Sequence, residues 1–254
     1  MELFDELKAQ IDGKNIRIVL PEGTEPRVLG AAARLQKEGI LVPVLLGQPE
    51  AIKSVALENN FDIDGIEIID MDNYPEFDDM VAAFVERRKG KVNDEEARKI
   101  LKDANFFGTM LTYMDKVDGM VSGAVHSTAD TVRPALQIVK TRPGVPRTSG
   151  SFLMLRGETR YLFADCAINI ELDAEGLAGV AVESARMAKM FGIDPKVAML
   201  SLSTKGSAKH DLITKVQDAT RMAKELAPDM VIDGELQFDA AVSETVAKQK
   251  APGS

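Results

Sequence analysis

The sequence predicts an α/β protein with two α/β domains and mostly parallel sheets. Strand and helix signals alternate along almost all of its 254 residues, which is typical of strand–helix–strand units. The apolar runs at residues 18–20 and 42–46 are continuous rather than alternating, which indicates strands covered on both faces. Two prolines and a glycine at residues 141–146 interrupt the pattern. We therefore expect a first domain over residues 1–143 and a second over residues 144–254.

The first domain begins with a strand and a helix whose ends are marked by their residues. Thr24 and Pro26 open the helix and Gly39 ends it, since proline suits a first helical turn and glycine a helix end. Further on, a charged stretch, ERRKGKVNDEEARK, separates helical segments. The expected elements are strands at residues 16–21, 42–46 and 66–69, helices at 24–39 and 49–60, and a helical region at 75–114.

The second domain opens with a predicted β-hairpin. Residues 151–155 and 160–168 are apolar and flank RGET, a short polar turn. Further elements are expected as a helix at residues 174–190, a strand at 197–203, a helix at about 208–226, a strand at 230–233 and a helix at 240–250.

A strand–loop–helix corner between the two groups of elements is the most informative segment. A short strand at residues 119–122 leads into a loop of small and hydroxylic residues. We expect Thr131 near the cap of the following helix and Pro134 in its first turn, where a missing N–H does no harm.

This corner could bind an anion. The start of a helix presents backbone N–H groups, and its dipole favours negative charge. Ser127, Thr128 and Thr131 add hydroxyl donors, and Arg133 adds a planar fork that matches phosphate or carboxylate. An ordinary capped helix with one surface arginine is the alternative that this corner alone leaves open.

A second polar loop, SLSTKGSAKHD, follows the strand of the second domain. Gly206 allows close backbone approach, and Lys205 and Ser207 are donors of the type that phosphate takes. The spacing GxxxxGK[ST] of a Walker loop is absent. On spacing alone, a polar helix start with Ser207 as its cap is the favoured interpretation.

A third loop, VIDGELQFDAAV, carries three carboxylates. Asp233, Glu235 and Asp239 could serve metal ligation, acid–base chemistry or turn formation. The Asp-Gly pair favours a turn.

The remaining candidates are weaker. Cys166 lies in an apolar strand and is expected to be a small core residue. His126 is expected to be a loop residue and His210 a solvated helix residue. Arg87 and Arg88 end a helix, where cations suit the dipole.

Composition excludes several classes of function. The formal net charge of −9 argues against nucleic acid and anionic lipid as partners, so any anion site must be a small positive island. No apolar run reaches the roughly 20 residues of a membrane span. The single cysteine fits a reducing compartment, and we expect a cytoplasmic protein. The motifs GxGxxG, HExxH, CxxC and GxSxG are absent.

Three long segments together resemble one family, the phosphate acetyltransferases (phosphotransacetylases) of the phosphate acetyl/butyryltransferase family. They are DGMVSGAVHSTADTVRPALQIVKT, KVAMLSLSTKGSAKHD and APDMVIDGELQFDAAV, in the family's order, and the resemblance covers essentially the whole chain. It implies reversible acetyl transfer between phosphate and coenzyme A, with no redox cofactor and no metal. It also implies a homodimer of two α/β domains in a fold similar to isocitrate and isopropylmalate dehydrogenases.

The resemblance also implies a set of substrate-binding residues. The arginine of the family's HSxxDTxRP motif falls on Arg133, which we expect to act in catalysis as well. A second family arginine falls on Arg88, with Arg87 as the less favoured register. With the hydroxyls of the corner, the expected substrate-binding residues are Arg88, Ser127, Thr128, Thr131, Arg133, Lys205, Gly206 and Ser207.

The sequence departs from the family in one respect. The family's catalytic aspartate lies in a segment LSRGxSxxD, and no position here matches it. In the family, helices of that segment also complete the first domain. We therefore expect a truncated chain that carries substrate-binding residues but no general base.

The expected chemistry is direct attack of the coenzyme A thiolate on acetyl phosphate within a ternary complex. Phosphate is a good leaving group, so no covalent enzyme intermediate is required. The alternatives are a phosphate butyryltransferase, a non-catalytic fragment that binds coenzyme A or phosphate, and a decarboxylating dehydrogenase of the same fold.

Overall fold

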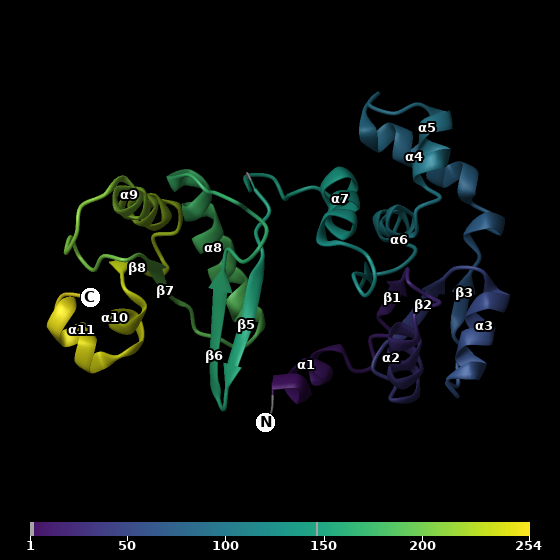
Figure 1. Cartoon of the computed structure of the whole chain (residues 1–254), viewed down its shortest axis with the longest axis horizontal. Helices are drawn as coiled ribbons and strands as arrows, with labels where there is room; N and C mark the ends of the chain where they lie inside the picture. Colours follow the sequence, from purple (N-terminus) through teal and green to yellow (C-terminus); the bar gives the residue numbers. More distant parts are fainter. Residues whose placement is uncertain (1–2, 146) are drawn as a thin grey trace. The chain divides into compact units, whose positions relative to one another are not determined.

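The computed structural model describes residues 3–145 and 147–254 (Figure 1). The chain divides into two compact units, Met1–Lys140 and Thr141–Ser254, which are described separately here. Pro146, in the segment expected to separate the domains, lies outside the described residues. Among those residues, no helix combines the length and the apolar character that crossing a membrane requires.

The first unit is built on a parallel sheet with the strand order β3-β2-β1-β4. Its parallel pairing confirms the expectation from the strand–helix alternation. The strands are β1 (Arg17–Leu20), β2 (Val42–Leu46), β3 (Glu67–Ile69) and β4 (Gly119–Met120).

Helices cover both faces of this sheet. Successive side chains of a strand point to opposite faces, and in β2 Val44 and Leu46 pack into one core while Leu45 packs into the other. The first core includes Phe84 and Phe107, and the second includes Leu29. The continuous apolar runs therefore belong to strands that are covered on both faces, as the sequence indicated. The helices are α1 (Leu3–Ile11), α2 (Pro26–Lys37), α3 (Pro49–Glu58), α4 (Phe77–Arg88), α5 (Asp94–Ile100), α6 (Ala104–Tyr113) and α7 (Thr128–Ile138), with a 3-10 turn η1 (Met71–Asn73).

Helix α7 begins earlier than the sequence predicted. Ser127 is its N-cap: the hydroxyl accepts the Asp130 N–H at 3.2 Å and donates to the Asp130 carboxylate at 2.7 Å. The expectation of a cap near Thr131 was wrong, since Ser127 with an acid three residues later makes the better cap. Pro134 lies inside the helix rather than in its first turn, so the Asp130 carbonyl lacks its intrahelical donor.

The second unit contains an antiparallel hairpin and a parallel strand pair. The hairpin joins β5 (Ser151–Arg156) to β6 (Thr159–Ala164), as predicted, and β7 (Lys196–Leu200) pairs in parallel with β8 (Val231–Leu236). The main core lies among β7, β8 and two long helices, and α8 has the predicted bounds. The helices are α8 (Ala174–Met190), α9 (Asp211–Leu226), α10 (Phe238–Val242) and α11 (Glu244–Lys250).

Three elements of the second unit differ from the prediction. Helix α9 begins at Asp211 with His210 as its N-cap, so Ser207 does not cap it. The Asp-Gly pair at 233–234 lies within β8 and does not form a turn. The last helix is split at Ser243, which has extended dihedral angles and caps α11.

At Gly234, strand β8 lies very close to its neighbours. A Cβ at this position would lie 2.6 Å from Met199 Cβ and 2.8 Å from Thr220 Oγ1. Strand β8 therefore packs against β7 and α9 at a distance that only glycine permits.

We predict that Gly234→Ala destabilises the second unit by about 1–3 kcal/mol, because well-packed neighbours must shift to admit a methyl group. Urea denaturation followed by circular dichroism measures this loss. Gly253→Ala is the matched control, because a Cβ there meets no atom within 4 Å. Equal stability of the two variants would contradict the argument.

Candidate functional site

The loop between β4 and α7 is held by one buried carboxylate. Glu22 directly follows β1, the neighbour of β4, so both lie at the carboxyl end of the parallel sheet, where α/β proteins place their ligands. Its Oε2 accepts the N–H groups of Gly123 at 3.2 Å and Ala124 at 2.8 Å. Its Oε1 accepts those of Val125 at 2.8 Å and His126 at 3.1 Å.

Glu22 is ionised in this setting. The side chain is only 2% exposed, and its Oε1 lies 2.7 Å from the His126 ring nitrogen Nδ1. Burial raises the pKa of this carboxyl, but the backbone N–H donors and His126 outweigh that effect and lower the pKa of Glu22 to about 2. Sequence reasoning missed Glu22; the available signal was a lone acid in the PEGT segment directly after the first strand.

The N–H groups that remain for an external anion are those at the start of α7. The Thr131 hydroxyl donates to the Ser127 carbonyl at 3.0 Å, and the Ser127 hydroxyl bonds to Asp130, so both are engaged within the helix. Thr128 and Ala129 occupy the first two helical positions, and their N–H groups meet no acceptor among the described residues. The first turn of α7 thus keeps two backbone donors at the positive end of its dipole.

Arg133 presents its charge on the same helix. Its side chain is 57% exposed, and its nearest carboxylate contact is Asp130 Oδ1 at 3.7 Å. An exposed pair at this separation contributes little, so the guanidinium can exchange it for a ligand. Thr128 and Arg133 therefore lie on the same short helix, the first at its start and the second about one and a half turns later.

Arg87 and Arg88 bind the other end of α7. Arg87 donates to the Ile138 carbonyl at 2.5 Å and lies over the Tyr113 ring at 5.1 Å from its centroid. Arg88 donates through NH1 to the Gln137 carbonyl at 3.4 Å. Both cations therefore complement the negative end of the α7 dipole as well as ending α4.

Arg88 retains one donor that the fold does not use. Its Nε is buried and has no hydrogen-bond partner among the described residues. Such a donor costs free energy unless a ligand or water takes it. This feature sets Arg88 apart from Arg87, whose Nε is fully engaged.

A second buried carboxylate organises the predicted loop of the other unit. Glu235 is 3% exposed, and its Oε1 accepts the Gly206 N–H at 2.6 Å and the Ser203 hydroxyl at 3.0 Å. Its Oε2 accepts from Gln217 at 3.1 Å. Burial raises the pKa of Glu235, but these donors, with Gly206 the strongest, hold it below the usual value. The Ser207 hydroxyl accepts the Thr204 N–H at 3.1 Å.

Lys205 is paired with an acid of β8. Its Nζ lies 2.6 Å from Asp233 Oδ1. Burial raises the pKa of Asp233, but Lys205 and the Ser254 hydroxyl lower it to about 2. Asp239 pairs with Lys250 at 2.8 Å. The three acids of this segment therefore have separate partners, and no group of three or more His, Cys, Asp or Glu able to hold a metal is found in the described ranges.

The minor candidates have structural roles. His210 is exposed, as expected, but it caps α9 rather than lying within it, and its Nδ1 accepts the Leu212 N–H at 3.1 Å. Cys166 is half-buried and donates to the Phe163 carbonyl at 3.3 Å.

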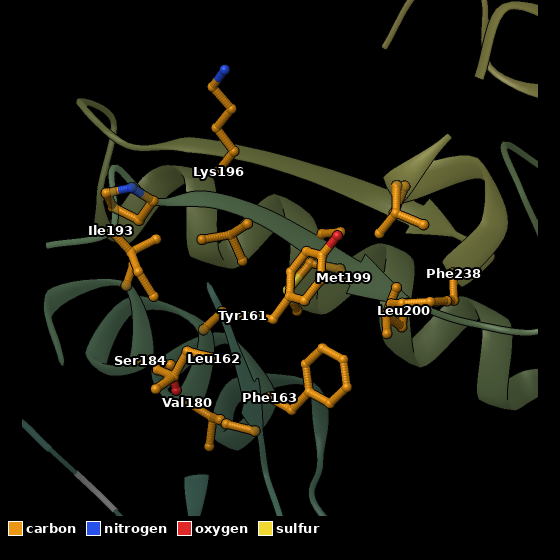
Figure 2. Close-up of a pocket in the computed structure, with 18 of the residues that line it drawn as sticks. Tyr161, Leu162, Phe163, Val180, Ser184, Ile193, Lys196, Met199, Leu200 and Phe238 are labelled. Atoms are coloured by element: carbon orange, nitrogen blue, oxygen red, sulfur yellow. The ribbon is translucent and has the colours of Figure 1, made fainter. Parts of the chain in front are cut away.

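An apolar hollow of about 320 Å³ lies in the second unit (Figure 2). It is formed by β6, α8, β7 and α10, with Tyr161, Phe163 and Phe238 among its walls. No predicted site residue lines it. Since its lining brings no carboxylate to a base or a nucleophile, this hollow does not mark the site of chemistry.

Comparison with known proteins gives these loops a family. A model of the phosphate acetyl/butaryl transferase family matches residues 2–254. The chain is 56% identical over 258 residues to a phosphate acetyltransferase of Staphylococcus epidermidis, covering 100% of this chain and 78% of that protein.

Two solved structures are similar. A phosphotransacetylase from Streptococcus pyogenes has a TM-score of 0.96 and 55% identity, covering 99% of this chain and 77% of that one. A phosphotransacetylase from Staphylococcus aureus has a TM-score of 0.93 at the same identity and the same coverage. Because the family model matches residues 2–254, the chain belongs to the phosphate acetyl/butaryl transferase family.

Proposed function

We propose that this chain transfers an acetyl group reversibly between phosphate and coenzyme A. The observation that carries the proposal is the match of the whole chain to relatives named phosphate acetyltransferase. The corner geometry supports it, because α7 carries both two N–H groups without a protein acceptor and an exposed guanidinium. Donors of this kind suit an anionic oxygen group such as phosphate better than a neutral ligand.

The donors of α7 have defined roles in this proposal. The N–H groups of Thr128 and Ala129 bind phosphate oxygens at the positive end of the helix dipole. Arg133 releases Asp130 and grips the phosphoryl group through its planar fork. Ser127 and Thr131 fix the shape of the helix tip through their hydrogen bonds rather than by direct contact.

The reaction needs no covalent enzyme intermediate. The coenzyme A thiolate attacks the acetyl carbonyl carbon and forms a carbon–sulfur bond. The bond between that carbon and the bridging oxygen breaks, and phosphate departs with the bridging oxygen and the electron pair of the broken bond. Negative charge grows on the carbonyl oxygen and then on phosphate, and Arg133 with the helix N–H groups stabilises the departing charge. Holding both substrates together lowers the entropic barrier. The general base is not assigned to any residue of this chain.

Several finer features belong to the same proposal. The fold is that of isocitrate and isopropylmalate dehydrogenases, the protein is a cytoplasmic homodimer, and coenzyme A is a substrate with no further cofactor or metal. Arg88, Lys205, Gly206 and Ser207 bind substrate. The buried Arg88 Nε without a partner supports this role for Arg88. For Lys205, the role requires that Asp233 release it.

We predict that Arg133→Ala lowers kcat/KM for acetyl phosphate on the order of 100-fold, because a donor to the departing charge is lost. Arg133→Lys restores only part of it, since an ammonium cannot bind in the bidentate manner. Calorimetric titration with acetyl phosphate measures the ground-state share of the loss. Arg34→Ala is the control, an exposed arginine of α2 paired with Glu38. Unchanged kinetics in Arg133→Ala would remove Arg133 from the site.

We predict initial-rate kinetics of the ternary-complex type, with intersecting double-reciprocal lines for the two substrates. Mass spectrometry of protein quenched during turnover should show no acetylated residue formed at the catalytic rate. Parallel lines together with such an acetyl-enzyme would contradict direct transfer. Acetyl phosphate should react faster than butyryl phosphate, and coenzyme A binding without turnover would support a non-catalytic binding protein instead.

A further inference from the structure

We propose that Glu22 is a positioning residue for phosphate binding: it binds the loop 123–126 from inside and thereby sets the place of the α7 tip. This inference rests on the proposed function, since it concerns the same phosphate site. Glu22 does not touch the substrate in this proposal. Its carboxylate acts through the backbone that leads into Ser127.

The loop that Glu22 holds leads directly into the proposed phosphate site. Four consecutive N–H groups, from Gly123 to His126, converge on one carboxylate at 2.8–3.2 Å. The next residue, Ser127, caps α7, and the two after it carry the N–H groups assigned to phosphate. No other segment intervenes, so a shift of the loop moves the phosphate donors directly.

The backbone at Glu22 is itself held in place by the close packing of Gly23. Its neighbour Gly23 packs so closely on β2 that a Cβ would lie 2.3 Å from the Leu46 carbonyl oxygen. Such contact leaves the backbone at residues 22–23 no freedom to follow a moving loop. Glu22 thus transmits the position of the sheet to the loop rather than adapting to it.

The loop makes few other hydrogen bonds to side chains. Ser122 donates to the fully buried Asn105 at 2.6 Å, and Arg27 donates to the Ala124 carbonyl at 3.0 Å. Arg27 is largely exposed. The N–H groups of residues 123–126, by contrast, have Glu22 as their only acceptor among the described residues.

Glu22 also determines where a substrate phosphate can bind. Successive N–H groups that converge form an anion-binding concavity. In this protein a carboxylate of the chain already fills that concavity, so a substrate phosphate is directed to the helix tip and Arg133. Removal of the Glu22 charge should therefore loosen the tip.

The test compares Glu22→Gln with Asp118→Asn. The glutamine keeps the size of Glu22 but offers one acceptor oxygen and an NH₂ group that opposes the remaining N–H donors. Asp118 immediately precedes β4, at its amino end, and accepts the Arg17 N–H at 2.7 Å, so its amide variant also weakens a carboxylate-to-backbone bond. Because Glu22 and the loop 123–126 lie beyond the carboxyl ends of β1 and β4, Asp118→Asn should leave acetyl phosphate affinity unchanged.

The expected result is selective. Glu22→Gln should weaken acetyl phosphate binding about tenfold or more, the change that loss of a charge-assisted hydrogen bond produces. Coenzyme A affinity should stay within about twofold in calorimetric titrations. In amide hydrogen-exchange experiments, residues 123–126 should lose protection in Glu22→Gln, while β2 keeps its protection.

Two outcomes would overturn the inference: a folded Glu22→Gln with wild-type affinity for acetyl phosphate, or an equal loss of affinity for both substrates. If Glu22→Gln does not fold, Glu22→Asp replaces it, since it keeps the charge and shortens the reach by one methylene. Its acetyl phosphate affinity should lie below wild type with coenzyme A binding retained, and wild-type affinity would again contradict the role. Failure of the wild-type protein to bind acetyl phosphate would instead reject the proposed function.

Discussion

Buried carboxylates that accept hydrogen bonds from loop residues are the interaction on which the rest of this structure depends. Glu22 holds the loop before α7, and Glu235 holds the loop before α9. Both loops consist largely of small and hydroxylic residues, which by themselves select no single conformation. An ionised carboxylate replaces the water that these N–H groups would otherwise bind, and charge-assisted bonds of this kind are among the stronger ones in proteins. Loop shape here is therefore set from the interior.

This arrangement explains how an acidic chain can hold an anion. With a net charge of −9, the protein repels anionic metabolites at long range, so binding depends on local donors. The loop donors are neutralised by Glu22, and what remains is the helix tip with Arg133. In the proposed function, these two N–H groups and one guanidinium form the small positive island that an acidic chain needs for binding an anion. Specificity then follows from geometry, because a fork and a helix tip together match a phosphoryl group.

The sequence predicted those features that depend on neighbours along the chain. Strands β1 and β2, the hairpin and helix α8 follow from apolar periodicity and turn residues, which are local signals. It failed where a distant partner decides: Glu22 binds a loop about a hundred residues later, and Asp233 and Gly234 continue in β8 because they pair with β7. The cap at Ser127 was missed for a local reason, since several hydroxyl residues compete in one stretch.

Arg87 and Arg88 bind helix α7, a role that the sequence did not predict for either of them. The sequence predicted either that they complete the end of α4 or that they contact substrate. In the structure, both side chains donate to carbonyls at the C-terminal end of α7. Cations there and an anion at the opposite end are favourable to the same helix dipole. Arg87 and Arg88 thus favour an anion at the tip, where the proposed function places phosphate, from the far end of the helix and without touching it. They differ in one respect: Arg88 keeps a buried Nε that has no hydrogen-bond partner among the described residues, whereas the Nε of Arg87 is bonded to the Ile138 carbonyl.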